Sequence, residues 1–270
     1  MIAEEISEQF DSVREKCPLV HCITNYVTVN DVANAVLAIG ASPIMADDIK
    51  EAADITSISS ALVINMGTLN QRTVASMIAA GKTANQKGIP VVFDPVGAGA
   101  SEFRNETART VMENVHVDIL RGNLSEMSFM AGLEVSTKGV DSAAEDEKND
   151  AVSVAKTVAE KFGCVAAITG AVDTICDGSR VIRISNGHSM LSKVTGTGCM
   201  TSGIVGGFAG ASDDMLLAAA AGICAMGIAG ELAYEKAGEL GTGSFHIAII
   251  DALSKLDGAL AAERIKADEK

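Results

Sequence analysis

Short runs of apolar, often β-branched residues alternate along the first two thirds of the chain with longer stretches of helical periodicity. The first pattern is typical of buried strands and the second of amphipathic helices. Strands are predicted at residues 19–23, 43–45, 61–65, 90–93, 117–120 and 164–168. Helices are predicted at residues 29–39, 49–59, 72–86, 102–114, 125–130 and 150–162. This alternation predicts an α/β fold, with a mostly parallel central sheet covered by helices on both faces.

The pattern changes after residue 168. Residues 173–176, 180–184 and 190–194 are predicted as short antiparallel strands at one edge of the sheet. Two nearly uncharged helices at 199–210 and 215–234 follow, and then an amphipathic helix near 245–260. The polar stretch 136–148 is predicted to be an exposed loop, and residues 262–270 a frayed tail. Without an internal repeat or linker, residues 1–270 are predicted to form a single domain.

The composition narrows the class of protein. Aromatic residues make up 3% of the 270 residues and glycine occurs 26 times, so the core must be packed mainly from aliphatic side chains. A net charge of -14 disfavours a nucleic-acid partner. The N-terminus lacks a signal-peptide pattern, and the longest uncharged run, residues 215–230, is shorter than the roughly 20 residues that span a bilayer. The sequence predicts a soluble, cytoplasmic protein with no membrane partner, whose six cysteines are free thiols.

Small polar clusters follow six of the predicted strands. They begin at Thr24, Met45, Asn65, Asp94, Arg121 and Thr169. Because the carboxyl ends of parallel strands share one edge, where open α/β sheets bind ligands, these clusters are predicted to form a single cleft.

A glycine turn, Gly196-Thr197-Gly198-Cys199, opens one of the apolar helices. Glycines allow successive backbone N–H groups to point outward, and the helix adds the positive end of its dipole, so the turn suits a phosphate in transit. It is neither a Walker loop nor a dinucleotide fingerprint, because no Gly-Lys-Ser/Thr follows and residue 201 is Thr. An ordinary glycine-rich helix start is the alternative reading.

Three charged side chains follow predicted strands. Asp94 and Glu126 are candidate ligands of Mg²⁺, which takes one or two carboxylates together with substrate phosphates. Arg121 is the cation placed to contact a phosphate in the cleft. For each of the three, a helix cap or a surface ion pair is the alternative.

At these positions the sequence resembles the hydroxyethylthiazole kinase family of the ribokinase-like superfamily. The matching stretches are residues 21–27, 40–46, 65–69, 94–100, 121–123, 193–199 and 243–245, in the family's order. Residues 94–99, Asp-Pro-Val-Gly-Ala-Gly, are common among related kinases. Cys199 is more specific, because most of the superfamily has an aspartate there as catalytic base.

The resemblance implies a ribokinase-like three-layer fold and transfer of the ATP γ-phosphoryl group to the hydroxyl of 4-methyl-5-(2-hydroxyethyl)thiazole, in thiamine biosynthesis or salvage. It also implies a homotrimer with sites at the subunit interfaces. The residues it implies are Asp94 and Glu126 around Mg²⁺, Arg121 and Thr169 at ATP, Asn25, Met45, Gly67 and Gly196 at the substrate, and Gly196, Thr197, Gly198 and Cys199 in catalysis. Thr197 stands where the family often has Ala, and its hydroxyl is expected to cap the helix.

Two alternatives stay open at this point. Another enzyme of the same fold, such as hydroxymethylpyrimidine kinase or ATP-dependent NAD(P)H-hydrate dehydratase, usually carries Asp where this chain has Cys199. A nucleotide-binding protein without catalysis would be expected to lack Asp94, Glu126 or the glycine turn. Within the kinase reading, phosphoryl transfer gains little from early proton removal, so the backbone donors of the turn are predicted to matter more than the Cys199 thiol.

Overall fold

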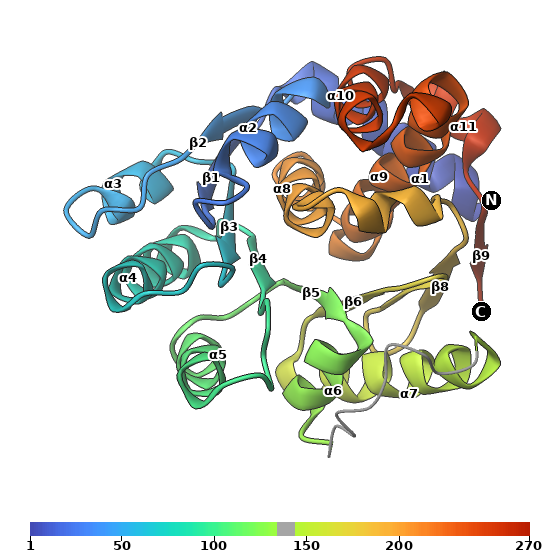
Figure 1. The fold of residues 1–270 in the computed structure, drawn as a ribbon. Helices are drawn as coiled ribbons and strands as arrows, with labels where there is room; N and C mark the ends of the chain where they lie inside the picture. The colour runs from blue at the N-terminus through green and yellow to red at the C-terminus, as the bar shows by residue number, and fades with distance from the viewer. Residues whose placement is uncertain (134–143) are drawn as a thin grey trace.

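One nine-stranded sheet forms the centre of the computed structural model, which describes residues 1–133 and 144–270 (Figure 1). Its strand order is β2-β1-β3-β4-β5-β6-β7-β8-β9. The first six strands of this order are parallel to one another, and each of the last three pairs antiparallel with the strand before it. The strands are β1 (Leu19–Ile23), β2 (Ser42–Ile44), β3 (Ala61–Asn65), β4 (Val91–Asp94), β5 (Ile119–Asn123), β6 (Val165–Thr169), β7 (Asp173–Cys176), β8 (Val181–Ile184) and β9 (Ala267–Glu269).

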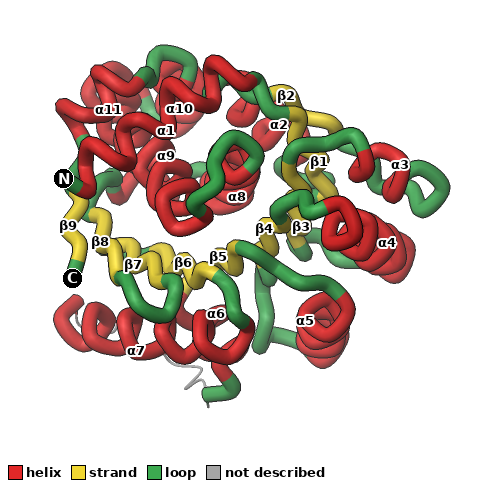
Figure 2. The backbone as a smooth tube through the Cα atoms, turned by 180° about the vertical axis from the view of Figure 1, so that it is seen from behind, coloured by secondary structure: helices red, strands yellow, loops and turns green. Residues whose placement is uncertain are grey.

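Helices cover both faces of the sheet, as the view along its edge shows (Figure 2). One layer contains α1 (Ile2–Lys16), α2 (Val29–Ala38), α8 (Thr197–Ala209), α9 (Met215–Ala237), α10 (Thr242–Leu253) and α11 (Gly258–Arg264). The other contains α3 (Ala52–Ser57), α4 (Gln71–Lys87), α5 (Glu102–Asn114), α6 (Leu124–Ala131) and α7 (Ala144–Phe162). Successive strand residues point to opposite faces, so Val63 packs in one core while Leu62 and Ile64 pack in the other. The predicted α/β architecture is confirmed.

The nearly uncharged helices α8 and α9 lie in close contact within one layer. A Cβ at Gly222 of α9 would lie 2.7 Å from the Cα of Val205 in α8, which explains why glycine stands there. By length and composition, the helical stretch Met215–Leu240 could cross a membrane, but 78% of its most apolar window is buried inside the protein. The nearly uncharged helix predicted at residues 215–234 is therefore a buried helix of the core.

Two predictions for the C-terminal third are wrong. Residues 190–194 do not form a strand: Ser189–Lys193 is a 3-10 helix, capped by His188, whose Nδ1 accepts a hydrogen bond from the Met190 amide at 3.1 Å. The place beside β8 is instead taken by β9, from the tail that was expected to fray. An ion pair of 2.6 Å between Arg180 and Glu269 helps to fix this strand.

Two other boundaries differ from prediction. The helix expected near 245–260 is broken into α10 and α11, because Asp257 caps α11 through a 2.8 Å hydrogen bond from the Leu260 amide. The loop expected at 136–148 falls partly outside the described residues, at 136–143, and residues 144–148 already belong to α7.

Candidate active site

A chain of hydrogen-bonded side chains crosses the carboxyl ends of five neighbouring strands. The Asn25 amide donates to Asn65 Oδ1 at 3.2 Å, and the Asn65 amide donates to Asp94 Oδ2 at 2.9 Å. Arg121 continues the chain: Nη1 lies 3.4 Å from Asp94 Oδ2, and Nη2 donates to Thr169 Oγ1 at 2.8 Å. These residues follow or end β1, β3, β4 and β6, or lie in β5, so the structure brings five of the six predicted clusters together; the cluster at Met45 is not part of this chain.

Asp94 is the most buried charged member of this chain, with 1% of its surface exposed. Its Oδ2 accepts hydrogen bonds from Asn65, from Arg121 and, at 2.6 Å, from the Ser202 hydroxyl, whereas its Oδ1 is buried without a partner. Burial raises the pKa of Asp94 to about 6, with Arg121 opposing this effect and Glu126 adding to it. The pairing with Arg121 is therefore buried, and the surface ion pair considered for Arg121 is not what the structure contains.

Glu126 lies close enough to Asp94 for their charges to interact, but it also caps a helix. Its carboxylate accepts the Asn123 amide, in a capping box at the start of α6, and the Gly97 amide, both at 2.8 Å. Each carboxylate oxygen has a second lone pair, so the cap leaves acceptor capacity on Glu126.

The residues present fit Mg²⁺, which takes one or two carboxylates and completes its shell with water and phosphate. The partnerless Asp94 Oδ1 is the oxygen that such a cation would satisfy. Among the residues that the structure describes, no cluster of three or more His, Cys, Asp or Glu side chains is placed to hold a metal ion. The Mg²⁺ role of Asp94 and Glu126 stays a prediction.

The glycine turn opens α8 directly beside Arg121. Gly196, with φ of 86°, is the N-cap residue, and the Met200 amide donates to its carbonyl at 2.8 Å. The preceding amides of the helix, at 197–199, have no carbonyl within it to bond. A Cβ at Gly198 would lie 3.1 Å from Arg121 Nη1, so the turn and the guanidinium face the same space.

Two side chains of the turn behave differently from each other. Cys199 Sγ accepts a hydrogen bond from Asn25 Nδ2 at 3.2 Å, which joins the thiol to the chain of polar residues. The Thr197 hydroxyl instead donates to the Leu191 carbonyl at 3.3 Å. The expected capping role of Thr197 is wrong, because Gly196 occupies the N-cap position and Thr197 is the first residue of the helix.

A cavity of about 280 Å³ lies beside the Asn25 end of this chain. Met45, one of the predicted substrate residues, lines it. Asn25 and Gly67 adjoin each other next to the lining residues Thr24 and Thr68, since a Cβ at Gly67 would lie 2.5 Å from Asn25. The full lining is Cys22, Thr24, Tyr26, Val29, Met45, Asp47, Thr68, Asn70, Arg72 and Thr73.

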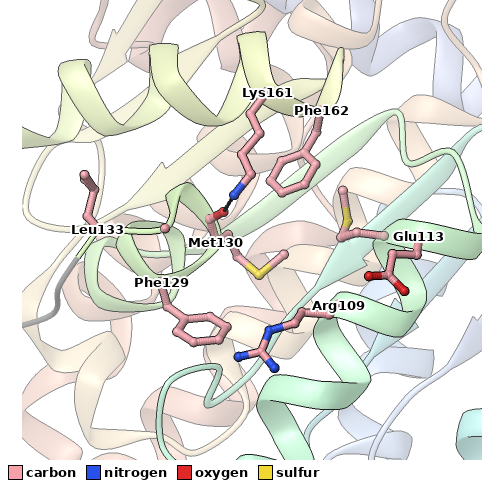
Figure 3. A pocket seen from close by; sticks show the side chains of 9 residues that line it. Arg109, Glu113, Phe129, Met130, Leu133, Lys161 and Phe162 are labelled. Carbon is pink, nitrogen blue, oxygen red and sulfur yellow. Dashed lines mark hydrogen bonds between the residues drawn. The ribbon is translucent and has the colours of Figure 1, made fainter.

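A second cavity, of about 450 Å³, lies among α5, α6 and α7 (Figure 3). Arg109, Phe129 and Phe162 line it, and Lys161 donates to the Met130 carbonyl at 2.9 Å on its wall. None of the predicted site residues lines this cavity, so it is separate from the polar chain at the strand ends.

The sequence left three contributors without a role. Asn65 stood in a motif, and its position at the end of a buried strand was a usable signal. Ser202 follows Gly198 by four residues and so lies on the same face of α8, which could also have been noticed. Arg104 carries no comparable signal, although its guanidinium donates to three carbonyls of the cleft loops.

Known proteins resemble this chain over nearly its whole length. The model of the hydroxyethylthiazole kinase family matches residues 10–259. The hydroxyethylthiazole kinase of Ruminiclostridium cellulolyticum is 61% identical over 98% of both chains, and that of Clostridium beijerinckii is 59% identical over 99% of this chain and 98% of its own.

The fold is shared with solved structures. A hydroxyethylthiazole kinase protein from Pyrococcus horikoshii OT3 superposes with a TM-score of 0.90, at 38% identity and 98% coverage of both chains. A Bacillus subtilis pyridoxal kinase in an ADP complex, at 18% identity and a TM-score of 0.55, covers 78% of this chain and 90% of its own and shares the ribokinase-like fold alone. The sequence matches and the fold agree, and the chain belongs to the hydroxyethylthiazole kinase family.

Proposed function

We propose that this protein transfers the γ-phosphoryl group of ATP to the hydroxyl of 4-methyl-5-(2-hydroxyethyl)thiazole. The observation that carries the proposal is the chain of hydrogen-bonded side chains from Asn25 to Thr169, which runs beside the glycine turn of α8. It joins the cavity of about 280 Å³ near Asn25 to the guanidinium of Arg121, and the N-terminus of α8 contacts both Asn25 and Arg121. Family membership supports the thiazole alcohol as acceptor.

In this proposal the phosphate side is formed by Arg121 and the first amides of α8. Asp94 and Thr169 fix the guanidinium from two sides, so its position is set before ATP binds. Fixed donors aimed at developing negative charge stabilise the transition state without reorganising during the reaction. Mg²⁺, when held by Asp94 and Glu126, would neutralise phosphate charge.

On the acceptor side, the cavity beside Met45 would hold the thiazole, with Asn25, Gly67 and Gly196 toward its reacting end. Asn25 donates to both Asn65 and Cys199, so its amide orients the thiol toward the same chain. Because phosphoryl transfer passes through a loose transition state, proton removal by this thiol would add less than the backbone donors of Gly198 and its neighbours.

We also infer that the protein forms a homotrimer in the cytoplasm, with sites completed at subunit interfaces. Exposed apolar side chains near the thiazole cavity support an interface: Tyr26 is 78% exposed and Val27 56%. Tyr26 itself lines the cavity, so a neighbouring subunit seated there would cover the substrate.

The proposed activity is tested by following ADP release with the thiazole alcohol, hydroxymethylpyrimidine or no acceptor, each with and without Mg²⁺. We expect ADP release only when the thiazole alcohol and Mg²⁺ are both present. Release with hydroxymethylpyrimidine and none with the thiazole would overturn the assignment.

A further inference from the structure

Arg104, in the first turn of α5, reaches out of its helix to two loops of the cleft. Its Nη1 donates to the Met66 carbonyl at 2.6 Å and to the Val96 carbonyl at 2.5 Å, and its Nη2 donates to the Gly67 carbonyl at 2.5 Å. Met66 and Gly67 lie in the loop after β3, whereas Val96 lies in the loop after β4. One side chain thus binds both loops at once.

The geometry of this contact matches the fork of a guanidinium. Within the described residues Arg104 forms no ion pair, in contrast to Arg109 on the same helix, which pairs with Glu102 at 3.5 Å. Three carbonyls from two loops match the planar fork of arginine, whereas a lysine ammonium is a single point of attachment. Gly97, with φ of 75°, adds to the fit, because a Cβ there would lie 3.1 Å from Arg104 Cδ.

Each loop that Arg104 holds carries a part of the site. In the first, the Gly67 amide donates to Asn65 Oδ1 at 2.8 Å, and the Gly67 backbone packs directly against the Asn25 side chain. In the second, the Gly97 amide donates to Glu126 Oε1 at 2.8 Å. Arg104 and its three hydrogen bonds, called the clamp below, therefore connect the acceptor side of the site to the Glu126 side.

We propose that Arg104 is a positioning residue that sets the spacing between the acceptor-binding loop at Gly67 and the carboxylate-holding loop at Gly97. The inference rests on the proposed kinase function. If these hydrogen bonds of Arg104 are lost, the positions of Asn25 and Glu126 relative to each other are no longer fixed. Arg121 keeps its own hydrogen bonds to Asp94 and Thr169. Loss of Arg104 should therefore affect the thiazole and Mg²⁺ more than ATP.

The test compares Arg104→Lys with the control Arg109→Lys, whose side chain is 55% exposed. We expect Arg104→Lys to lower kcat/KM for the thiazole alcohol about 10- to 100-fold, since misplacement by roughly 1 Å can cost 10²-fold. The Mg²⁺ concentration for half-maximal rate should rise, whereas ATP affinity measured by calorimetry should change no more than about twofold. Arg109→Lys should stay within about twofold in every constant.

Hydrogen exchange gives a second readout that does not depend on activity. In Arg104→Lys, the peptides that contain Gly67 and Gly97 should exchange faster together, without a uniform increase over the chain. Uniform acceleration, or an unchanged thiazole kcat/KM in an active enzyme, would overturn the clamp. A wild-type protein that is inactive on the thiazole would contradict only the proposed function. Hydrogen exchange at the two loops would still test whether Arg104 holds them in place.

Discussion

Asp94 is a residue of the site whose burial lowers the stability of the folded protein. Three donors surround its Oδ2, but Oδ1 is buried without any, and burial raises the pKa of the carboxyl to about 6. Ionising this carboxyl is therefore less favourable than ionising an ordinary aspartate, and a cation at Oδ1 would offset the difference. Such a residue is expected to limit stability where it supports activity.

This cost has a defined pH dependence. The folded-state pKa of about 6 exceeds the value of 3.8 for an ordinary aspartate, so ionisation destabilises the fold as pH rises through this window. We expect Asp94→Asn to lower turnover at least about 10²-fold. Without Mg²⁺ it should nevertheless be more stable than wild type at pH 8, by at most about 3 kcal/mol, and the difference should vanish near pH 4.

Thermal unfolding across this pH range, beside ADP release, checks the expectation. Asp213→Asn, at an exposed position between α8 and α9, is the matched control and should change neither quantity. An Asp94→Asn protein that is fully active and less stable at every pH would mean that the carboxylate is only structural.

The glycine turn allows a comparison between backbone and thiol. A Cβ at Gly198 would lie 3.1 Å from Arg121 Nη1, so Gly198→Val should displace the guanidinium and lower kcat by about 10²- to 10³-fold. Cys199→Ala removes the thiol and with it one of the two acceptors of the Asn25 amide, and should cost no more than about 10²-fold. Steady-state assays of the two variants decide: an inactive Cys199→Ala beside a nearly normal Gly198→Val would make the thiol the main catalyst.

Among the elements, α8 contributes most directly to the site, because it carries the glycine turn and is held by close packing against α9.

The local sequence pattern was enough to predict the strands β1 and β3 and the helix α5 with the bounds observed. It failed at Ser189–Lys193 and β9, because the partner of β8 comes from more than 80 residues along the chain and no local signal identifies it. Arg104 was missed for the same reason, since two of its three partners lie 37 and 38 residues away.

The packing of α8 on α9 is tested by adding one methyl group. A Cβ at Gly222 would lie 2.6–3.0 Å from atoms of Val205, two of them backbone, so Gly222→Ala should destabilise the protein by about 1–3 kcal/mol. Gly243→Ala, in α10 where a Cβ would meet nothing within 4 Å, should be neutral or stabilise by up to about 1 kcal/mol. Chemical denaturation measures both, and equal effects would contradict the close approach.

For the whole molecule, the parallel part of the sheet explains why the sequence located the site before any contact was known. Residues after β1, β3, β4 and β6 necessarily emerge at one edge, so Asn25, Asp94 and Thr169 could be grouped from the strand pattern. Their hydrogen-bond partners could not be assigned in this way, because side-chain geometry depends on packing between layers.

The proposed homotrimer is also a property of the whole molecule. Sedimentation should give a particle of about 83 kDa, three copies of the 27.7 kDa chain, at the concentrations used for assay. A monomer that retains full activity would contradict the interfacial site and leave the kinase reaction itself untouched.

The central claim is that the γ-phosphoryl group passes from ATP to the thiazole alcohol at the strand ends around Asp94 and Gly198. The most direct measurement follows ATP labelled in its γ-phosphate and identifies the labelled product, for the wild type and for Gly198→Val. With the wild type we expect the label in the thiazole phosphate ester. With Gly198→Val we expect almost no label in the thiazole phosphate ester or in inorganic phosphate. Label found only in inorganic phosphate, or equal transfer by Gly198→Val, would contradict the claim.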